Sequence, residues 1–194
     1  MLIKKGGTVV RNNLFGVMLM LLVLNAQANA YTGNVNFFLG QKSLDSDDWR
    51  PLEDQGEFGV LVDFKQSHWP VSVAIDILVS ADEATELGIR FEGITSEING
   101  GVRKIWEVSG SSIRPYIGGG LALVSADLEA SAFTTVSDDD NSIGIWLNGG
   151  IYWTLGKSFN LGLDIRYSQA EVTIVGVDVE AGGTHAGLIL GYHW

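Results

Sequence analysis

The sequence contains no cysteine and only 3 prolines and 3 histidines among its 194 residues. Without cysteine, the protein relies on neither disulfide bonds nor thiol chemistry. Beyond the first thirty residues, no apolar run approaches the roughly 20 residues that a helix needs to cross a bilayer. Together with 25 glycines, this excludes a helical membrane protein.

Basic residues are also scarce, with 12 lysines and arginines against 23 aspartates and glutamates and a net charge of −11. A protein that neutralises nucleic-acid phosphates needs a basic surface, so nucleic acid is excluded as a partner. The acidic surface suits divalent cations or basic partners, and it keeps exposed loops soluble.

The first thirty residues are predicted to be a cleaved signal peptide. Lys4, Lys5 and Arg11 precede an apolar run from Leu14 to Leu24, and small residues at Ala28 and Ala30 close the segment. This run is too short for a transmembrane helix and matches an export signal. We therefore divide the chain into a signal peptide (1–30) and one mature domain (31–194), whose net charge is −14 because three basic residues leave with the signal.

The mature chain alternates in polarity with a period of two, which indicates strands with one apolar face. The end of the chain shows this well, because every second residue from 186 to 194 belongs to one apolar face: Ala186, Leu188, Leu190, Tyr192 and Trp194. A hydrocarbon layer leaves sheet edges unsatisfied, so a spanning sheet must close on itself. The fold class predicted is therefore all-β, an eight-stranded antiparallel transmembrane β-barrel with an up-and-down meander.

Eight strands are predicted, at about 31–42, 56–66, 70–81, 87–107, 113–127, 143–155, 158–173 and the terminal segment near 185–194. In the third, Val71, Val73, Ile75, Ile77 and Val79 point to lipid. The fourth strand slips phase between Phe91 and Ile94, so a bulge is expected at Gly93.

Predicted connections are short at 67–69, 109–112 and 156–157, and longer and acidic at 43–55, 129–141 and 175–182. Outer-membrane barrels keep short turns in the periplasm and long loops outside, so both ends of the mature chain are placed at the periplasmic rim. The aromatic residues expected at the membrane interface there are Trp69, Trp106, Trp153, Tyr192 and Trp194.

The same alternation predicts an internal charge network, made of Asp63, Lys65, Asp76, Glu97, Arg103, Arg114, Asp164 and Arg166. Four acidic and four basic side chains can pair in a narrow lumen, where unpaired charges would be costly. A barrel of about eight strands has room for side chains and little else, which favours a filled polar lumen over a solute channel. Glycines at 118, 120 and 150 on the inner face leave space for bulky neighbours.

These segments resemble a known family. The stretch Arg114–Leu121 reads Arg-Pro-Tyr-Ile-Gly-Gly-Gly-Leu, and together with Gly162–Tyr167 and the closing Gly191–Trp194 it is similar to small OmpA/OmpX-type, opacity-like outer-membrane β-barrels. The resemblance implies residence in the bacterial outer membrane, contact with its lipids and lipopolysaccharide, and recognition of the last strand by the barrel-assembly machinery. That family usually ends in phenylalanine, whereas this chain ends in Trp194.

Three functions stay open: a structural or surface-interaction barrel, which is favoured, a narrow channel for small solutes, and a lipid-modifying enzyme. For the enzyme, only His185 lies toward the outer end of its strand, where Ser168, Glu171 and Glu180 could approach it. The alternation nevertheless points the His185 side chain into the barrel. No catalytic residue, cofactor or metal site is therefore predicted. The acidic loops 43–55 and 129–141 remain candidates for an extracellular ligand or for weak contact with divalent cations.

Overall fold

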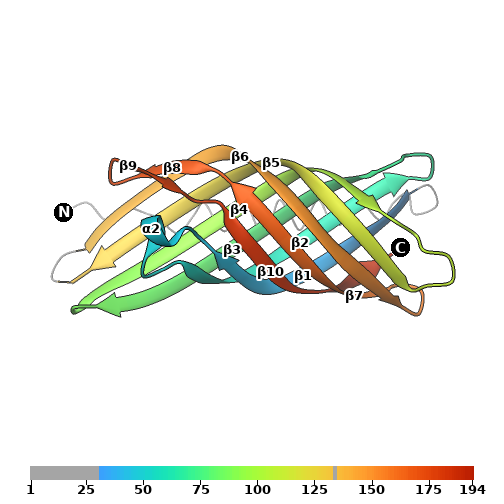
Figure 1. Cartoon of the computed structure of the whole chain (residues 1–194), viewed down its shortest axis with the longest axis horizontal. Helices are drawn as coiled ribbons and strands as arrows, with labels where there is room; N and C mark the ends of the chain where they lie inside the picture. The colour runs from blue at the N-terminus through green and yellow to red at the C-terminus, as the bar shows by residue number, and fades with distance from the viewer. Residues whose placement is uncertain (1–30, 133–134) are drawn as a thin grey trace, which may run out of the picture.

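The computed structural model describes residues 31–132 and 135–194, and the predicted signal peptide at 1–30 lies outside the described residues. Eight long antiparallel strands close into one barrel in the order β1, β10, β7, β6, β5, β4, β3, β2 (Figure 1). The strands are β1 (Tyr31–Ser43), β2 (Asp54–Gln66), β3 (Ser72–Glu86), β4 (Ile89–Ile105), β5 (Ile113–Ser131), β6 (Thr135–Leu155), β7 (Phe159–Gln169) and β10 (Gly183–His193). Each strand pairs with its neighbours in sequence, and β1 meets β10 at the seam, so the predicted eight-stranded meander is confirmed.

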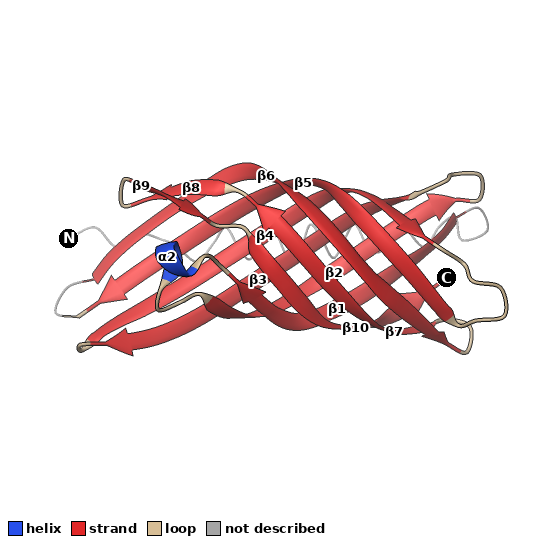
Figure 2. Cartoon of the chain, in the orientation of Figure 1, coloured by secondary structure: helices blue, strands red, loops and turns tan. Residues whose placement is uncertain are grey.

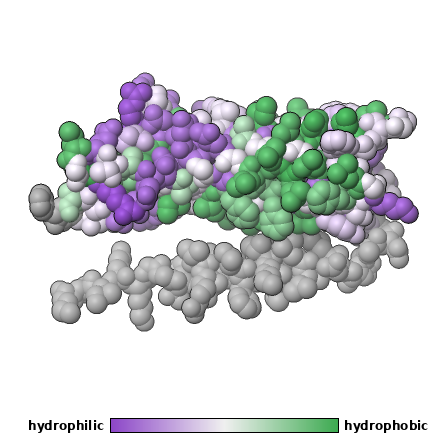
Figure 3. Space-filling view, turned by 90° about the horizontal axis from the view of Figure 1, so that it is seen from below, coloured by the Kyte–Doolittle hydropathy of each residue, from purple (hydrophilic) through white to green (hydrophobic). Residues whose placement is uncertain are grey.

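Alternating polarity decides which side chains fill the barrel. In β3, Ala74, Asp76 and Leu78 are at most 1% exposed, whereas Ile75 and Val79 on the other face are 36% and 45% exposed. The same pattern around the barrel leaves a belt of exposed leucine, isoleucine, valine and phenylalanine on its outside (Figure 3). No helix in the described part of the chain is long and apolar enough to cross a membrane.

The seam joins β1 to β10, the first and last strands of the described chain. Phe37 lies opposite Leu190, and the pairing extends to the last residue, where the backbone groups of Gly33 and Trp194 exchange two hydrogen bonds of 3.1 Å. The Trp194 ring lies over Gly33, where an added Cβ would come within 2.6 Å of it. Trp194 therefore completes the closed sheet and occupies the space that a side chain at position 33 would need.

The two ends of the barrel differ. One end, called the rim here, carries the short connections at 67–71, 106–112 and 156–158. The other, called the crown, comprises 43–55, 82–92, 125–132, 135–141 and 169–182, and holds the short helix α2 (Ser46–Trp49) and the hairpin of β8 (Glu171–Ile174) and β9 (Val177–Glu180) (Figure 2).

The predicted strand at 158–173 is wrong in its last part. The chain leaves the barrel at Ala170, and residues 171–174 instead form β8, which pairs with β9 across the crown. The Glu180 carboxylate holds this departure point, because it accepts hydrogen bonds from the backbone N–H groups of Ala170 (2.6 Å) and Gly182 (3.0 Å). Alternation continues through the break, so it does not reveal where the strand changes partner.

The predicted bulge at Gly93 is also wrong. Residues of β3 and β4 pair without interruption from Ser72–Arg103 to Glu86–Ile89, with Asp82 opposite Gly93. Phe91 simply shares the inward parity of Glu97. Because this end of the β3–β4 ribbon projects beyond the apolar belt, its outer face need not be apolar there.

The segment at 129–141 is not a loop, as predicted, but mostly strand. β5 continues to Ser131 and β6 begins at Thr135, and Asp127 pairs directly with Asp139. Polar residues form strand here because both faces of the ribbon lie beyond the apolar belt, so pairing of the backbone does not require an apolar face.

Candidate functional site: the lumen and the crown

A buried ion-pair cluster lies in the middle of the lumen. Arg103 Nη2 and Arg166 Nη2 each donate to Asp76 Oδ2 at 2.7 Å, and Arg103 Nη1 donates to Asp63 Oδ2 at 3.2 Å. Arg166 also lies 3.5 Å from Asp164. All five side chains are at most 1% exposed. Side chains from β2, β3, β4 and β7 thus meet at one level of the barrel.

Aromatic rings complete this level. Tyr116 and Tyr152 stack with their ring centres 4.4 Å apart, and their hydroxyls donate to Asp164 (2.5 Å) and Asp63 (3.2 Å). The Arg166 guanidinium lies 5.1 Å from the centre of the Trp146 ring. Tyr116 fits because position 150 is glycine, where an added Cβ would collide with the tyrosine hydroxyl.

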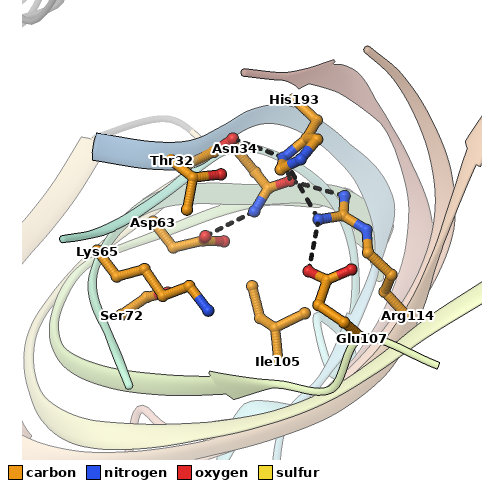
Figure 4. A pocket seen from close by; sticks show the side chains of 10 residues that line it. Thr32, Asn34, Asp63, Lys65, Ser72, Ile105, Glu107, Arg114 and His193 are labelled. Carbon is orange, nitrogen blue, oxygen red and sulfur yellow. Dashed lines mark hydrogen bonds and ion pairs between the residues drawn. The ribbon is translucent and has the colours of Figure 1, made fainter. Parts of the chain in front are cut away.

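Toward the rim, Arg114 is the central group. Its Nη2 donates to Asn34 Oδ1 (3.0 Å) and Asn160 Oδ1 (2.9 Å), and its Nη1 lies 3.6 Å from the exposed Glu107 carboxylate. Figure 4 shows Arg114 and His193 converging on Asn34, with Lys65 across the mouth. The cavity among these residues measures about 10 Å³, close to the space of a single water.

Lys65 departs from the other predicted lumen charges. It is half-buried at the rim mouth, and within the described part of the chain no carboxylate lies within 4.0 Å of its ammonium. The other seven predicted residues are all buried in the lumen, with at most 4% exposure.

A second buried cluster lies toward the crown. Lys42 Nζ donates to Glu97 Oε1 (2.9 Å) and to the Ala181 carbonyl (2.8 Å). His185 Nδ1 lies 2.8 Å from Glu57 Oε1, while its Nε2 lies 3.0 Å from Ser168 Oγ and 3.4 Å from Glu97 Oε1. Sequence reasoning omitted Lys42 and Glu57, although both have inward parity in their strands.

The Ser168, His185 and Glu57 side chains have the distances of a hydrolytic triad, but not its surroundings. Ser168 also donates to Glu97 Oε1 at 2.8 Å, and Ser168 and His185 are at most 1% exposed. A serine nucleophile needs an unprotonated histidine beside it and room for a substrate. Each ring nitrogen of His185 instead faces a carboxylate, Glu57 at Nδ1 and Glu97 at Nε2.

An apolar cap lies at the crown end of the lumen. The cap consists of residues from two connections packed on inward-facing residues of β5. Leu44 and Trp49 come from the connection between β1 and β2, Val172 and Ile174 come from β8, and the β5 residues are Ala122, Val124 and Ala126. Trp49 Nε1 donates to the Glu180 carbonyl at 2.7 Å, and Asp48 accepts from the Glu180 backbone N–H at 2.9 Å. Helix α2 and the β8–β9 hairpin therefore form one unit over the barrel mouth.

Two aspartates of β6 anchor that hairpin. Asp140 Oδ2 accepts from the Thr173 backbone N–H (2.8 Å) and Asp138 Oδ2 from that of Val175 (2.6 Å). The hydrogen bonds from the backbone of Thr173 and Asn141 lower the pKa of Asp140. By contrast, partial burial, and then the facing Asp139, raise the pKa of Asp127. Within the described residues, no group of three or more histidine, aspartate or glutamate side chains is arranged to hold a metal ion.

The predicted interface aromatics lie at the rim. Trp69, Trp106, Trp153 and Tyr192 are between 36% and 53% exposed, and Trp194 is half-buried against Gly33.

No protein-family model matches the sequence, and no curated protein is detectably similar to it in sequence. Solved structures do match. The attachment invasion locus protein Ail of Yersinia pestis, in complex with the heparin analogue sucrose octasulfate, is 12% identical, with a TM-score of 0.61 over 85% of this chain and 99% of Ail. A major outer membrane protein from Thermus thermophilus is 10% identical, with a TM-score of 0.55 over 86% of this chain and 99% of that one.

Neisserial surface protein A is 13% identical, with a TM-score of 0.51 over 84% of this chain and 95% of its own. The fold is that of the small outer-membrane β-barrels. The fold expected from the resemblance is thus confirmed. At 10 to 13% identity, the comparison carries the fold and not the activity.

Proposed function

We propose that the mature chain is an integral barrel of the bacterial outer membrane with a structural or surface-interaction role, and that its lumen does not conduct. The observation that carries this proposal is a series of side-chain layers along the barrel axis: the Arg114 group, the Arg103 cluster, the Lys42–His185 cluster and the apolar cap. The side chains at the centre of each layer are almost wholly buried. A barrel that fills its lumen in this way leaves its crown as the surface available for function.

The outer membrane is the proposed location because the barrel combines an exposed apolar belt with rim aromatics and matches outer-membrane barrels in fold. The crown then faces the exterior and the rim the periplasm. The predicted signal peptide and recognition of the terminal strand by the assembly machinery belong to the same proposal. Trp194 supports recognition of the terminal strand, because it pairs with Gly33 at the seam where the barrel closes.

The partner proposed for the crown differs from the ligand seen in the Ail structure. The crown holds 17 of the 23 acidic residues and only Arg50 and Arg90 of the basic ones. Such a surface repels polyanions such as sucrose octasulfate and attracts cations. Contact with lipopolysaccharide is proposed at the apolar belt, with divalent cations between its phosphates and the crown carboxylates.

Planar-bilayer recordings test the closed lumen. Purified mature protein refolded into lipid is expected to give no conductance steps, with a wide outer-membrane porin as the positive control. Steps that disappear when a lumen side chain is enlarged, as in Ala74→Leu, would establish the channel instead.

Mass spectra of lipid A test the remaining alternative, a lipid-modifying enzyme. Expression of the protein is expected to leave lipid A unchanged, because Ser168 and His185 are buried inside the barrel rather than exposed to the outer leaflet. A mass change that is lost in His185→Ala and kept in His68→Ala, whose histidine lies in an exposed rim turn, would establish an enzyme.

A further inference from the structure

An apolar groove lies on the crown between helix α2 and the β8–β9 hairpin. Trp49, Leu128, Ile174, Val175, Val177 and Val179 line it, together with Asp48, and its volume is about 270 Å³. This approaches the smallest pockets that hold ligands, about 300 Å³. Val175 and Val177 are 67% and 61% exposed, so the apolar lining is open to solvent.

The groove lies in the most acidic part of the molecule. The crown carries a formal charge of −15, whereas the rest of the mature chain carries +1. The polar zone and the apolar belt occupy opposite ends of the face seen in Figure 3. At the groove itself, Asp48 is part of the lining, Asp138 and Asp140 contact the hairpin from β6, and Asp178 of β9 accepts a hydrogen bond from the Thr173 hydroxyl within the hairpin.

The backbone at Val175 is held in an unfavourable conformation. Its φ is +53°, in the left-handed region that β-branched residues rarely adopt. Asparagine or glycine would be easier there, and neither would present an apolar surface. The hydrogen bond from its N–H to Asp138 helps to hold the turn. A strained residue whose side chain stays exposed points to a use for that side chain outside the fold.

We propose that this groove binds an apolar side chain of a basic peptide segment, such as the exposed arm of a cationic protein, whose lysines or arginines meet the surrounding carboxylates. The proposal deepens the surface-interaction role proposed above and rests on it. The groove supplies apolar contact for one side chain, and the crown supplies attraction for the charges beside it.

Charge disfavours the other occupants. A second copy of the chain would bring one crown of charge −15 against another. Sulfated glycans and lipid phosphates would meet the same repulsion. A purely apolar ligand would gain nothing from the carboxylates around the groove. Only a ligand that is both apolar and cationic uses both features.

The test uses the mature protein in zwitterionic nanodiscs and follows the valine methyl signals by NMR. The probe is a short peptide with one leucine flanked by lysines, which is too polar to partition into the lipid. Two matched peptides replace the leucine with serine or the lysines with glutamates, and sucrose octasulfate is the polyanionic probe. We expect saturable shifts at Val175, Val177 and Val179 with the leucine–lysine peptide only, weakening at high salt because exposed charges are then screened.

Val175→Asn separates binding from folding. Asparagine tolerates positive φ, so the variant is expected to fold at least as stably, yet to bind the peptide roughly tenfold more weakly because an apolar contact is lost. Leu87→Asn is the matched control, because Leu87 also has positive φ (+51°) in the β3–β4 turn, is fully exposed, and does not line the groove. Its affinity for the peptide should be unchanged.

Equal binding of the serine–lysine peptide, equal loss in both asparagine variants, or preference for sucrose octasulfate would each overturn the proposal. Conductance is a separate readout. A closed barrel that ignores the peptide would contradict the groove alone, whereas a conducting barrel that binds it would contradict the proposed function alone.

Discussion

Arg103 is the residue on which the central lumen cluster depends most directly. Its guanidinium contacts Asp63 and Asp76 in a fully buried setting. A charged group that loses a partner in such a place costs far more than the ion pair itself contributes, because bulk water does not solvate it there. Neighbouring residues on the outer face have no such role.

Arg103→Met is therefore expected to lower the free energy of unfolding by about 3–5 kcal/mol, since it leaves two buried carboxylates short of a partner. Urea titration of the protein in lipid vesicles, read from tryptophan fluorescence, measures this. Lys104→Met is the control: Lys104 lies on the outer face and donates to the Pro70 carbonyl, so it should cost less than about 1 kcal/mol. Equal losses in the two variants would refute the argument.

Adjacent glycines give a second residue-scale prediction. At Gly150 an added Cβ would collide with the Tyr116 hydroxyl and the Leu163 carbonyl, whereas at Gly149 it would meet only the Tyr116 carbonyl, at an ordinary 3.7 Å. Gly150→Ala should cost about 1–3 kcal/mol through overpacking, and Gly149→Ala should cost little. The same urea titration compares them, and a Gly150→Ala barrel as stable as the wild type would show that the ring has room to move.

At the scale of elements, the β8–β9 hairpin shows how carboxylates replace strand pairing. The residues of β6 that precede Ile145 no longer pair with β7. Two of their side chains instead accept hydrogen bonds from the backbone of the β8–β9 hairpin. The acidic run at 138–140 thus has a structural use for two of its three carboxylates. A cluster that suggested cation contact from sequence alone is partly satisfied by backbone N–H groups.

The anchoring predicts a local effect. In Asp138→Ala/Asp140→Ala, the Thr173 and Val175 amides should exchange with solvent at least about tenfold faster than in the wild type, because each loses its acceptor. Asp139→Ala is the matched control: Asp139 faces Asp127 across the ribbon, so its removal should leave hairpin exchange unchanged. Amide hydrogen exchange is measured by NMR. Equal exchange rates at Thr173 and Val175 in the two variants would contradict the role of Asp138 and Asp140 as anchors.

The same anchor predicts a pH dependence. The pKa of Asp140 is lowered below its ordinary 3.8 by the hydrogen bonds it accepts, so the carboxylate stabilises the hairpin fully above that value. The contribution is lost as the pH falls through the lowered pKa. Exchange at Thr173, corrected for its intrinsic rate, should therefore rise only below pH 3.8, and a rise centred above that value would exclude Asp140 as its cause.

At the scale of the whole molecule, buried side chains fill the lumen at more than one level. The apolar cap lies at the crown, and the buried Arg103 cluster and its tyrosines lie near the middle, so the closed lumen proposed above would be closed twice. The two layers use different chemistry, apolar packing at the crown and ion pairs near the middle, although β5 contributes to both. Trp146 contacts both, but the ion pairs of the Arg103 cluster involve no residue of the cap.

Weakening the cap alone should therefore leave the barrel closed. Trp49→Ala removes the largest cap side chain, yet planar bilayers should still show no conductance because the charged layer below remains. Its crown hairpin should nevertheless exchange faster, since Trp49 no longer bonds the Glu180 carbonyl. Conductance from this single variant would show that the charged layer leaves a path open.

The inward and outward sides of most strands follow from parity in the sequence, as Asp76 and Ile75 illustrate. This works because the apolar belt requires one apolar face on each strand, and a period of two then fixes the direction of every side chain within it. Parity also places Lys42 and Glu57 inside, because both fall within the predicted strands 31–42 and 56–66.

Only the tertiary structure decided what happens above the belt. There, neither face must be apolar, so polarity no longer marks strands. Residues 125–131 and 135–141 pair as a ribbon, and the chain after Ala170 leaves the barrel. The pairing of His185 with Glu57, 128 residues away, and the groove between α2 and the β8–β9 hairpin depend on which segments meet in space. Alternation of polarity along the sequence does not predict these long-range contacts, because they arise from closure of the sheet and from packing between connections that are distant in sequence.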